Sequence, residues 1–216
     1  MKASKDISTS VISRLPRYYR FLCDLYEKGT NRISSKELAE IMGLTASQVR
    51  QDFNCFGGFG QQGYGYNIEQ LIGEFAGILG LNELKTAILI GAGNLGRAVA
   101  NQMSFEDKGF KLIGIFDCDP LYNGIKIRDI PISTDDKIEE FCNTHHPDMA
   151  VLCLPADKAP EMVEMLINLG IKSFWNFSHF DIHRNYPDTN VANVHLSDSL
   201  MTLSFIIKNN TGDTDD

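Results

Sequence analysis

This 216-residue sequence lacks the features that identify membrane-spanning and secreted proteins. It contains no run of 18 apolar residues, the length that a membrane-spanning helix requires. Its first residues lack the hydrophobic segment of a signal peptide. We therefore expect a cytoplasmic protein with no membrane partner. Its hydrophobic content of 43% and charged content of 22% are ordinary for a globular protein.

The cysteines are few and follow no recognisable pattern. All five are far apart and none forms a C-x-x-C pair, which argues against a disulfide framework and a zinc ribbon. Cys153 lies in an apolar strand pattern and is most simply a small buried side chain; a redox-active thiol is the alternative. His145 and His146 have no third ligand nearby, so we expect no metal site there.

Charge is distributed unevenly along the chain. The net charge of −8 argues against a generic nucleic-acid binder. Residues 1–66 nevertheless hold nine Lys and Arg against six Asp and Glu, whereas residues 67–216 hold 11 against 22. This asymmetry indicates two domains with different partners.

The first third of the chain has the pattern of a helix-turn-helix. Residues 14–28 carry apolar side chains at helical spacing. Ser34 with Glu37 predicts a capping box for a second helix, and Thr45 with Gln48 predicts one for a third. The alternative is a helical hairpin that serves only dimer packing.

The residues after these helices have the patterns of a winged-helix hairpin and of a linking helix. The segment 57–65 holds five glycines among aromatic residues, which is typical of the hairpin wing of a winged helix. Residues 68–81 carry an apolar stripe and predict a linking helix.

In a helix-turn-helix the second helix enters the major groove with its N-terminal residues toward the bases. Gln48 can pair with adenine, and Arg50 with guanine or a phosphate. The candidate DNA-binding residues on this helix and on the wing are Thr45, Ala46, Ser47, Gln48, Arg50 and Tyr64.

An apolar run at residues 87–90 turns into a G-x-G-x-x-G motif at residues 91–96. A second apolar run ends in Asp117, 21 residues after the last glycine. A strand, a glycine turn, a helix, a strand and an acid in this order predict a dinucleotide site. The alternative is a turn that only packs a helix on a sheet. The candidate residues are Gly91, Ala92, Gly93, Asn94, Leu95, Gly96 and Asp117.

Each glycine of this motif has an expected role. Gly91 permits the bend, Gly93 lets the backbone reach a pyrophosphate, and Gly96 lets the helix pack closely on the strand. Asp117 would accept hydrogen bonds from ribose hydroxyls and repel a 2′-phosphate, which favours NADH or NAD⁺ over the phosphorylated cofactors. Arg97 is either a phosphate contact or a solvated surface residue.

The remaining elements predict an α/β fold. Candidate strands alternate with helices, which implies a doubly wound parallel Rossmann sheet: strands 86–90, 112–116, 149–154 and 173–177, and helices 95–104, 135–143 and 158–169. A last apolar helix at residues 197–208 could bury against a partner subunit. We expect a DNA-binding domain at 1–80, a Rossmann domain at 81–195, a dimerisation helix at 196–208 and a disordered tail at 209–216.

The two halves together resemble the Rex family of redox-sensing transcriptional repressors over residues 8–207. No single motif is decisive, and the order and joint presence of all of them carry the resemblance. They are Ile12–Arg20, Ser34–Ala39, Gln48–Asp52, Phe56–Tyr66, Gly91–Gly96, Phe116–Pro120, Leu154–Ala156, Asn176–Phe177 and Leu203–Phe205.

This resemblance implies a homodimer with an N-terminal winged helix-turn-helix, a C-terminal Rossmann domain and a domain-swapped last helix. Family members bind a palindromic operator in double-stranded DNA and release it when NADH rises, so the protein would be a sensor and not an enzyme. The resemblance adds Leu154, Pro155 and Phe177 to the cofactor-binding residues. It adds Gln51, Gln62 and Gly63 to the DNA-binding residues.

The chain departs from the family at positions that matter for the switch. Gln51, Gln61 and Gln62 stand where the family has Lys or Arg, Gln102 replaces a tyrosine, and Ser178-His179 replaces a small residue and proline. His195 replaces an acid that is often paired with the arginine matching Arg20. A Rex-like paralogue with an altered or lost NADH response is therefore one alternative. An NAD-dependent oxidoreductase is another, against which the lack of a recognisable acid–base constellation argues.

Overall fold

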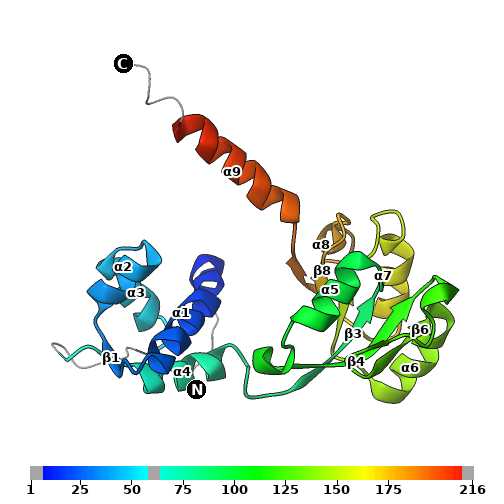
Figure 1. The fold of residues 1–216 in the computed structure, drawn as a ribbon, viewed down its shortest axis with the longest axis horizontal. Helices are drawn as coiled ribbons and strands as arrows, with labels where there is room; N and C mark the ends of the chain where they lie inside the picture. The colour runs from blue at the N-terminus through cyan, green and yellow to red at the C-terminus, as the bar shows by residue number, and fades with distance from the viewer. Residues whose placement is uncertain (1–6, 58–63, 211–216) are drawn as a thin grey trace. The chain divides into compact units, whose positions relative to one another are not determined.

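The structure is a computed structural model that describes residues 7–57 and 64–210. The chain forms two compact units, Met1–Asn82 and Glu83–Asp216 (Figure 1). This division falls two residues after the domain boundary expected from the sequence. In neither described part does any helix combine the length and apolarity needed to cross a bilayer.

The described part of the first unit is mainly helical. Helix α1 packs along α4, and α2 packs on α3. Their shared core contains Tyr18, Phe53 and Phe75, whose rings meet mostly edge to face. The elements are α1 (Thr9–Glu27), β1 (Arg32–Ile33), α2 (Ser35–Met42), α3 (Ala46–Asn54), β2 (Tyr66–Asn67) and α4 (Ile68–Ile78).

The predicted helix-turn-helix caps are present. The Ser34 hydroxyl accepts a hydrogen bond from the Glu37 amide, and the Glu37 carboxylate accepts one from the Ser34 amide, which completes the capping box of α2. Thr45 caps α3 more simply, because its hydroxyl accepts from the Gln48 amide at 3.2 Å. Between the helices, Gly43 adopts φ +66°, a left-handed conformation that favours glycine.

Helix α1 begins at Thr9, five residues before the predicted start. Pro16 therefore lies inside the helix, where its missing N–H removes one backbone hydrogen bond. The earlier start follows from packing, since one buried face runs the length of the helix: Val11, Leu15, Tyr18 and Leu22.

The predicted hairpin wing lies partly outside the described residues, which resume at Tyr64. Strand β2 pairs antiparallel with β1, with Ile33 opposite Tyr66. The strand that follows the glycine-rich segment thus pairs with the strand that precedes α2. Gly65 permits this approach, because a Cβ at this residue would lie 2.9 Å from the Ile33 carbonyl oxygen.

The second unit contains a seven-stranded sheet. Its strand order is β5-β6-β4-β3-β7-β8-β9, and all neighbours are parallel except β5 and β6. Numbered along the chain from β3, the six parallel strands have the order 3-2-1-4-5-6 of a doubly wound Rossmann sheet. The predicted α/β fold is therefore present. The strands are β3 (Lys85–Ile90), β4 (Phe110–Asp117), β5 (Lys126–Ile127), β6 (Ile130–Thr134), β7 (Met149–Leu152), β8 (Ser173–Asn176) and β9 (Asn190–Asn193).

Helices cover both faces of this sheet. One apolar core contains residues of α5, and the opposite core contains residues of α6, α7 and α8. The helices are α5 (Asn94–Gln102), α6 (Ile138–His145), α7 (Ala159–Asn168), α8 (Ile182–Asn185) and α9 (Leu196–Asn210), with short 3₁₀ turns at Glu106–Lys108, Pro120–Tyr122 and Asp135–Lys137.

Several predicted boundaries are wrong by a few residues. The helix expected at 135–143 is a 3₁₀ turn followed by α6, and the helix expected at 95–104 ends at Gln102 because Met103 is extended. Helix α9 continues to Asn210, so residues 209 and 210 are helical and not part of a disordered tail. Residues 211–216 lie outside the described chain.

Candidate nucleic-acid interface and dinucleotide site

Helix α3 presents one polar face to solvent and one apolar face to the core. Val49, Asp52 and Phe53 are buried, so the residues between them face outward. Of the predicted DNA-binding residues, Ala46 is half-buried and packs against the core, and Gln48 is half-buried. The exposed members are Thr45, Ser47, Arg50 and Gln51.

Arg50 is the cation that α3 displays on this face. Its guanidinium donates to the Ser35 hydroxyl at 3.1 Å, which draws it toward the first turn of α2. This contact is exposed, so water can replace it when a stronger acceptor such as a phosphate approaches. Arg50 therefore fits the predicted contact with guanine or phosphate.

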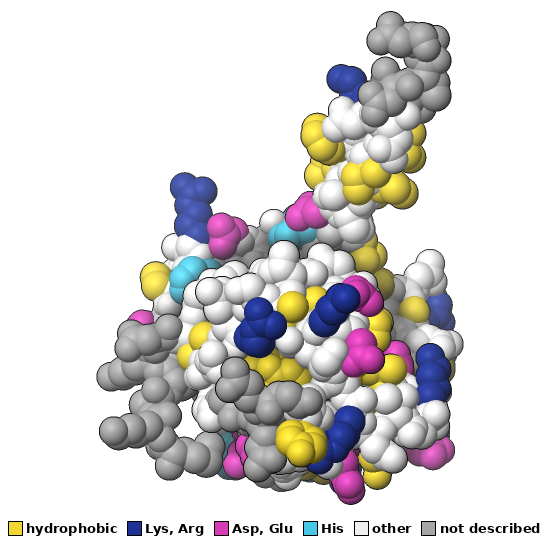
Figure 2. Space-filling view, turned by 90° about the vertical axis from the view of Figure 1, so that its left-hand side faces the viewer, with side chains coloured by type: hydrophobic (Ala, Val, Ile, Leu, Met, Phe, Trp, Pro, Cys, Tyr) yellow, Lys and Arg dark blue, Asp and Glu magenta, His cyan; other side chains and the backbone are white. Residues whose placement is uncertain are grey.

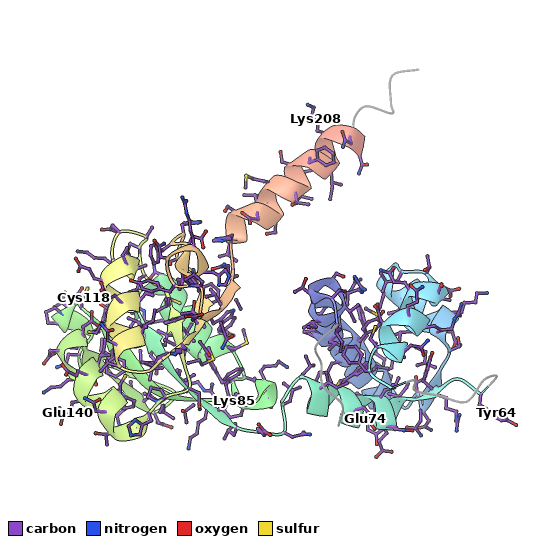
Figure 3. The ribbon with its side chains drawn as sticks, turned by 180° about the vertical axis from the view of Figure 1, so that it is seen from behind. Tyr64, Glu74, Lys85, Cys118, Glu140 and Lys208 are labelled. Atoms are coloured by element: carbon purple, nitrogen blue, oxygen red, sulfur yellow. The ribbon has the colours of Figure 1, made fainter. Side chains whose placement is uncertain are left out.

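A hydrogen bond from β1 holds Tyr64, the first described residue after the glycine-rich segment. The Arg32 guanidinium donates to the Tyr64 carbonyl at 3.0 Å. The Tyr64 side chain is 72% exposed and points away from the helices of its unit (Figure 3). Gln61, Gln62 and Gly63 lie outside the described residues.

The glycine turn between β3 and α5 has the geometry that its sequence requires. Gly91 has φ +94°, and a Cβ there would lie 2.5 Å from the Cys153 carbonyl oxygen. A Cβ at Gly96 would lie 1.8 Å from the Gly91 carbonyl oxygen, so α5 packs on the turn only because Gly96 has no side chain. A Cβ at Gly93 would meet nothing within 4 Å, which leaves this backbone open to a ligand.

Asp117 ends β4 beside this turn and holds it. One carboxylate oxygen accepts from the Ala92 amide at 2.5 Å, and the other accepts from the Asp119 amide at 2.8 Å. Each carboxylate oxygen has two lone pairs, so both keep capacity for a ribose hydroxyl. Asp117 thus also joins the glycine turn to the loop after β4 through hydrogen bonds, a role that the sequence did not predict.

Arg97 in the first turn of α5 is half-buried and has local partners. Its guanidinium lies 5.1 Å from the centre of the Tyr122 ring and donates to the Asn94 side chain at 3.2 Å. Both interactions hold the cation beside the helix N-terminus, where an anion is favoured. This placement favours the phosphate-contact alternative.

Cys118, labelled in Figure 3, lies exposed in the loop that joins β4 to Tyr122.

The other predicted cofactor residues follow neighbouring strands. Leu154 and Pro155 come after β7, and Phe177 comes after β8. Since β3, β7 and β8 are parallel neighbours, their carboxyl ends share one edge with the glycine turn. The Phe177 amide donates to the Leu152 carbonyl at 2.9 Å, and Leu154 would lie 3.2 Å from a Cβ at Gly91. Ligands of open α/β sheets bind at this edge.

Two histidines that depart from the family pattern meet at the same edge. The rings of His179, after β8, and His195, after β9, lie parallel with centroids 5.5 Å apart. Asn176 links the segments on either side of these histidines: its buried amide donates to Asn193 at 2.8 Å, and its carbonyl oxygen accepts from Ser178. The departures at His179 and His195 therefore contact each other just before α9, and Ser178 bonds to Asn176 beside them. Gln102 lies exposed at the end of α5.

Burial decides the role of Cys153. Burial raises the pKa of its thiol to about 12, so the reactive thiolate is scarce at neutral pH. This argues against the redox-active alternative and leaves Cys153 as a packing residue.

Helix α9 has no buried residue, although it is strongly apolar. Figure 2 shows its hydrophobic side chains open to solvent along the helix. An apolar surface of this extent marks an interaction site. The exposed members are Leu196, Leu200, Met201, Leu203, Phe205, Ile206 and Ile207.

Comparisons with known proteins agree with both halves. The family described as "Putative DNA-binding protein N-terminus" matches residues 6–54, and the family described as "CoA binding domain" matches residues 82–180. The chain is 53% identical over 205 residues to the redox-sensing transcriptional repressor Rex of Caldanaerobacter subterraneus subsp. tengcongensis, covering 95% of this chain and 91% of that protein. It is 48% identical over 211 residues to the Rex of Clostridium perfringens strain SM101, covering 97% and 99%.

Solved structures extend the similarity to the fold. RSP, a Rex-family repressor, has a TM-score of 0.87 and 46% identity over 96% of this chain and 97% of its own. RSP in complex with β-NAD⁺ and operator DNA has a TM-score of 0.86 and 46% identity over 98% of this chain and 100% of its own. RSP in complex with β-NADH has a TM-score of 0.88 and 45% identity over 96% and 97%. This chain belongs to the Rex family of redox-sensing transcriptional repressors.

Proposed function

We propose that this protein is a redox-sensing transcriptional repressor that binds operator DNA through its first unit and NADH or NAD⁺ through its second. The observation that carries the proposal is the joint presence, in one chain, of a capped helix-turn-helix and a Rossmann glycine turn with an acid after the next strand. The resemblance to RSP, whose structures contain NADH, NAD⁺ and operator DNA, supports the same assignment. The protein is a regulator and not an enzyme.

In the proposed complex, α3 lies in the major groove. Gln48 hydrogen-bonds to adenine and Arg50 to guanine or a phosphate, while Thr45, Ala46, Ser47 and Gln51 face the same groove. In this proposal the wing residues Gln62, Gly63 and Tyr64 contact the sugar–phosphate backbone of the DNA beside the major groove. Glutamines at 51 and 62 in place of cations remove phosphate contacts, so affinity should depend less steeply on salt than in a relative with Lys or Arg there.

In the second unit, we propose that the dinucleotide crosses the glycine turn. Its pyrophosphate contacts the backbone at Gly93, Asn94 and Leu95, at the positive end of α5. The Asp117 carboxylate accepts from a ribose hydroxyl and repels a 2′-phosphate. Leu154, Pro155 and Phe177 line the site beyond the pyrophosphate.

The proposed protein is a homodimer in which the apolar residues of α9 pack against a second copy. The support is the complete exposure of this helix in a single chain, because a soluble protein rarely leaves such a surface uncovered. In the family arrangement, the helix is exchanged between the two subunits. Sedimentation of the full chain tests this directly, with a dimer expected at micromolar concentration and a monomer contradicting it.

One alternative rests on the histidine cluster. His179 and His195, two departures from the family, stack on one another just before α9, and Ser178 bonds to the neighbouring Asn176. In this alternative the protein binds operator DNA and NADH but does not couple the two. A double titration separates the alternatives, because coupling requires that NADH change the operator affinity and that operator change the NADH affinity by the same factor.

A further inference from the structure

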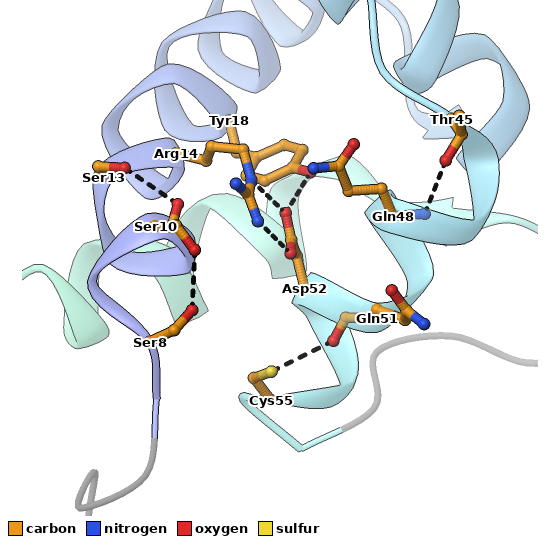
Figure 4. A network of polar contacts seen from close by, with 10 residues as sticks. All are labelled: Ser8, Ser10, Ser13, Arg14, Tyr18, Thr45, Gln48, Gln51, Asp52 and Cys55. Carbon is orange, nitrogen blue, oxygen red and sulfur yellow. Dashed lines mark hydrogen bonds and ion pairs between the residues drawn. The ribbon is translucent and has the colours of Figure 1, made fainter.

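A partly buried ion pair joins helix α3 to helix α1. The Arg14 guanidinium donates from Nε to one carboxylate oxygen of Asp52 and from a terminal nitrogen to the other, both at 2.7 Å. The Tyr18 hydroxyl donates to the first of these oxygens at 2.9 Å. Figure 4 shows all three side chains converging between the two helices. The Asp52 side chain is only 4% exposed and that of Arg14 is 22% exposed.

Stability alone is a weak reason for this arrangement. Removing two charges from water costs as much as their attraction returns, and a buried ion pair is often replaceable by apolar residues at no loss of stability. The surrounding core already packs well without it, since the Tyr18 and Phe53 rings meet edge to face at 5.2 Å. The pair therefore calls for a second explanation.

Geometry provides that explanation. Apolar contacts are non-directional, whereas a planar guanidinium bound to a carboxylate through two parallel hydrogen bonds sets both distance and angle. Asp52 lies one turn after Gln48 and follows Gln51 directly on the same helix. Because these residues belong to one helix, an interaction that fixes the orientation of Asp52 also fixes the orientation of Gln48 and Gln51 toward DNA.

Arg14 is also a cation whose charge is already matched. The hydrogen bond to Asp52 raises the pKa of the Arg14 guanidinium above its usual value. A phosphate would have to compete with a bidentate carboxylate for this group. Arg14 therefore differs from Arg50, which donates to an exposed neutral hydroxyl, that of Ser35.

We propose that Arg14 and Asp52 are positioning residues for operator recognition: their bidentate pair, completed by Tyr18, fixes the tilt of α3 on α1 so that Gln48 meets the base edges. This inference rests on the proposed role of α3 in DNA binding. Direct base contacts are lost when a side chain is misplaced by a fraction of an ångström or 10–20°. Non-specific binding to phosphates tolerates such a change, because it depends on charge.

The test replaces the pair by apolar residues of similar size in the full-length protein. In the variant Arg14→Met/Asp52→Leu, we expect thermal stability at or near that of the wild type and a fall of at least tenfold in affinity for operator DNA. Affinity for a scrambled duplex and the slope of log affinity against log salt should not change. The variant Asp52→Asn keeps the size of the side chain and should lose operator affinity in the same direction, and it decides the matter if the double variant does not fold.

Arg50→Ala is the matched control. It removes an exposed cation of α3, so it should lower affinity for both duplexes and reduce the salt slope by about one. If Arg50→Ala had no effect, the proposed function of α3 would fail. If Arg50→Ala acted as expected while a folded pair variant bound operator within twofold of the wild type, the positioning role would be refuted. A salt slope reduced by about one in Arg14→Met/Asp52→Leu, the variant that removes the Arg14 cation, would instead make Arg14 a phosphate contact.

Discussion

Replacing Gly93 by alanine should weaken NADH binding without disturbing the fold. Gly93 caps α5 with φ −66° and ψ −167°, a conformation open to alanine, and the added Cβ would meet nothing within 4 Å. In the proposed complex this open space is filled by the pyrophosphate. The methyl group would then hold the phosphates away from the free amides at the start of α5.

The magnitude follows from the hydrogen bonds at risk. A hydrogen bond to a charged group contributes roughly 1.5–3 kcal/mol, so losing one raises the dissociation constant about tenfold or more. The free energy of unfolding should hardly change. Alanine gains about 0.4–1 kcal/mol by restricting the unfolded chain, and the loss of a glycine cap offsets part of this.

Titration of intrinsic NADH fluorescence, together with thermal denaturation, measures both quantities. Gly73→Ala is the control, because Gly73 lies inside α4 and a Cβ there also meets nothing within 4 Å; it should leave NADH affinity unchanged. Gly96→Ala should differ from both by lowering stability as well as affinity, since its Cβ would lie 1.8 Å from a backbone oxygen. Wild-type NADH affinity in Gly93→Ala would refute the proposed path of the pyrophosphate.

Other substitutions test separate parts of the account. Leu200→Asp combined with Phe205→Asp should convert the proposed dimer to monomers in sedimentation, because two charges cannot be buried unpaired in an apolar interface; a dimer that persists would contradict the role of α9. Burial and the nearby Asp117 raise the pKa of the Asp135 carboxyl, so its ionised form destabilises the fold above that pKa. Asp135→Asn should therefore raise the melting temperature at pH 7 and lose this advantage below about pH 4, and equal shifts at both pH values would be inconsistent with it. His179→Ala should remove a ring contact of about 0.5–1.5 kcal/mol and speed hydrogen exchange at residues 194–198, with no change if the stacking is incidental.

Local patterns predicted the elements that position both sites. Ser34 with Glu37, Thr45, and the turn from Gly91 to Gly96 each encode structure over a few residues, and each is found where its pattern placed it. The four strands that the sequence predicted, β3, β4, β7 and β8, also agree with the structure within a few residues. Such features depend on backbone requirements that a short stretch of sequence already contains.

Strands β5, β6 and β9 were missed because they lack a strong local signal. Pro131 interrupts β6, and asparagines bound β9 at both ends. Both strands form because the sheet offers an edge to pair with, β4 for β6 and β8 for β9. This is a tertiary effect that overrides weak strand propensity.

Contacts between residues far apart in the chain could not be predicted from the sequence either. Arg14 and Asp52 are 38 residues apart, and nothing in the sequence links one to the other. His179 and His195 were noted separately as departures from the family, and only the fold brings their rings together. A charged residue at a core-facing helical position, such as Asp52 between Val49 and Phe53, is a signal that could have indicated a buried partner.

The central claim is that NADH controls operator binding, and one titration tests it most directly. Full-length protein is titrated against labelled palindromic operator DNA at a fixed 0.15 M salt, with no nucleotide, with NAD⁺ and with NADH, each at a concentration that saturates binding. We predict that NADH weakens operator affinity by at least tenfold relative to NAD⁺. Equal affinity under both conditions, with NADH binding demonstrated in the same sample, would contradict the account.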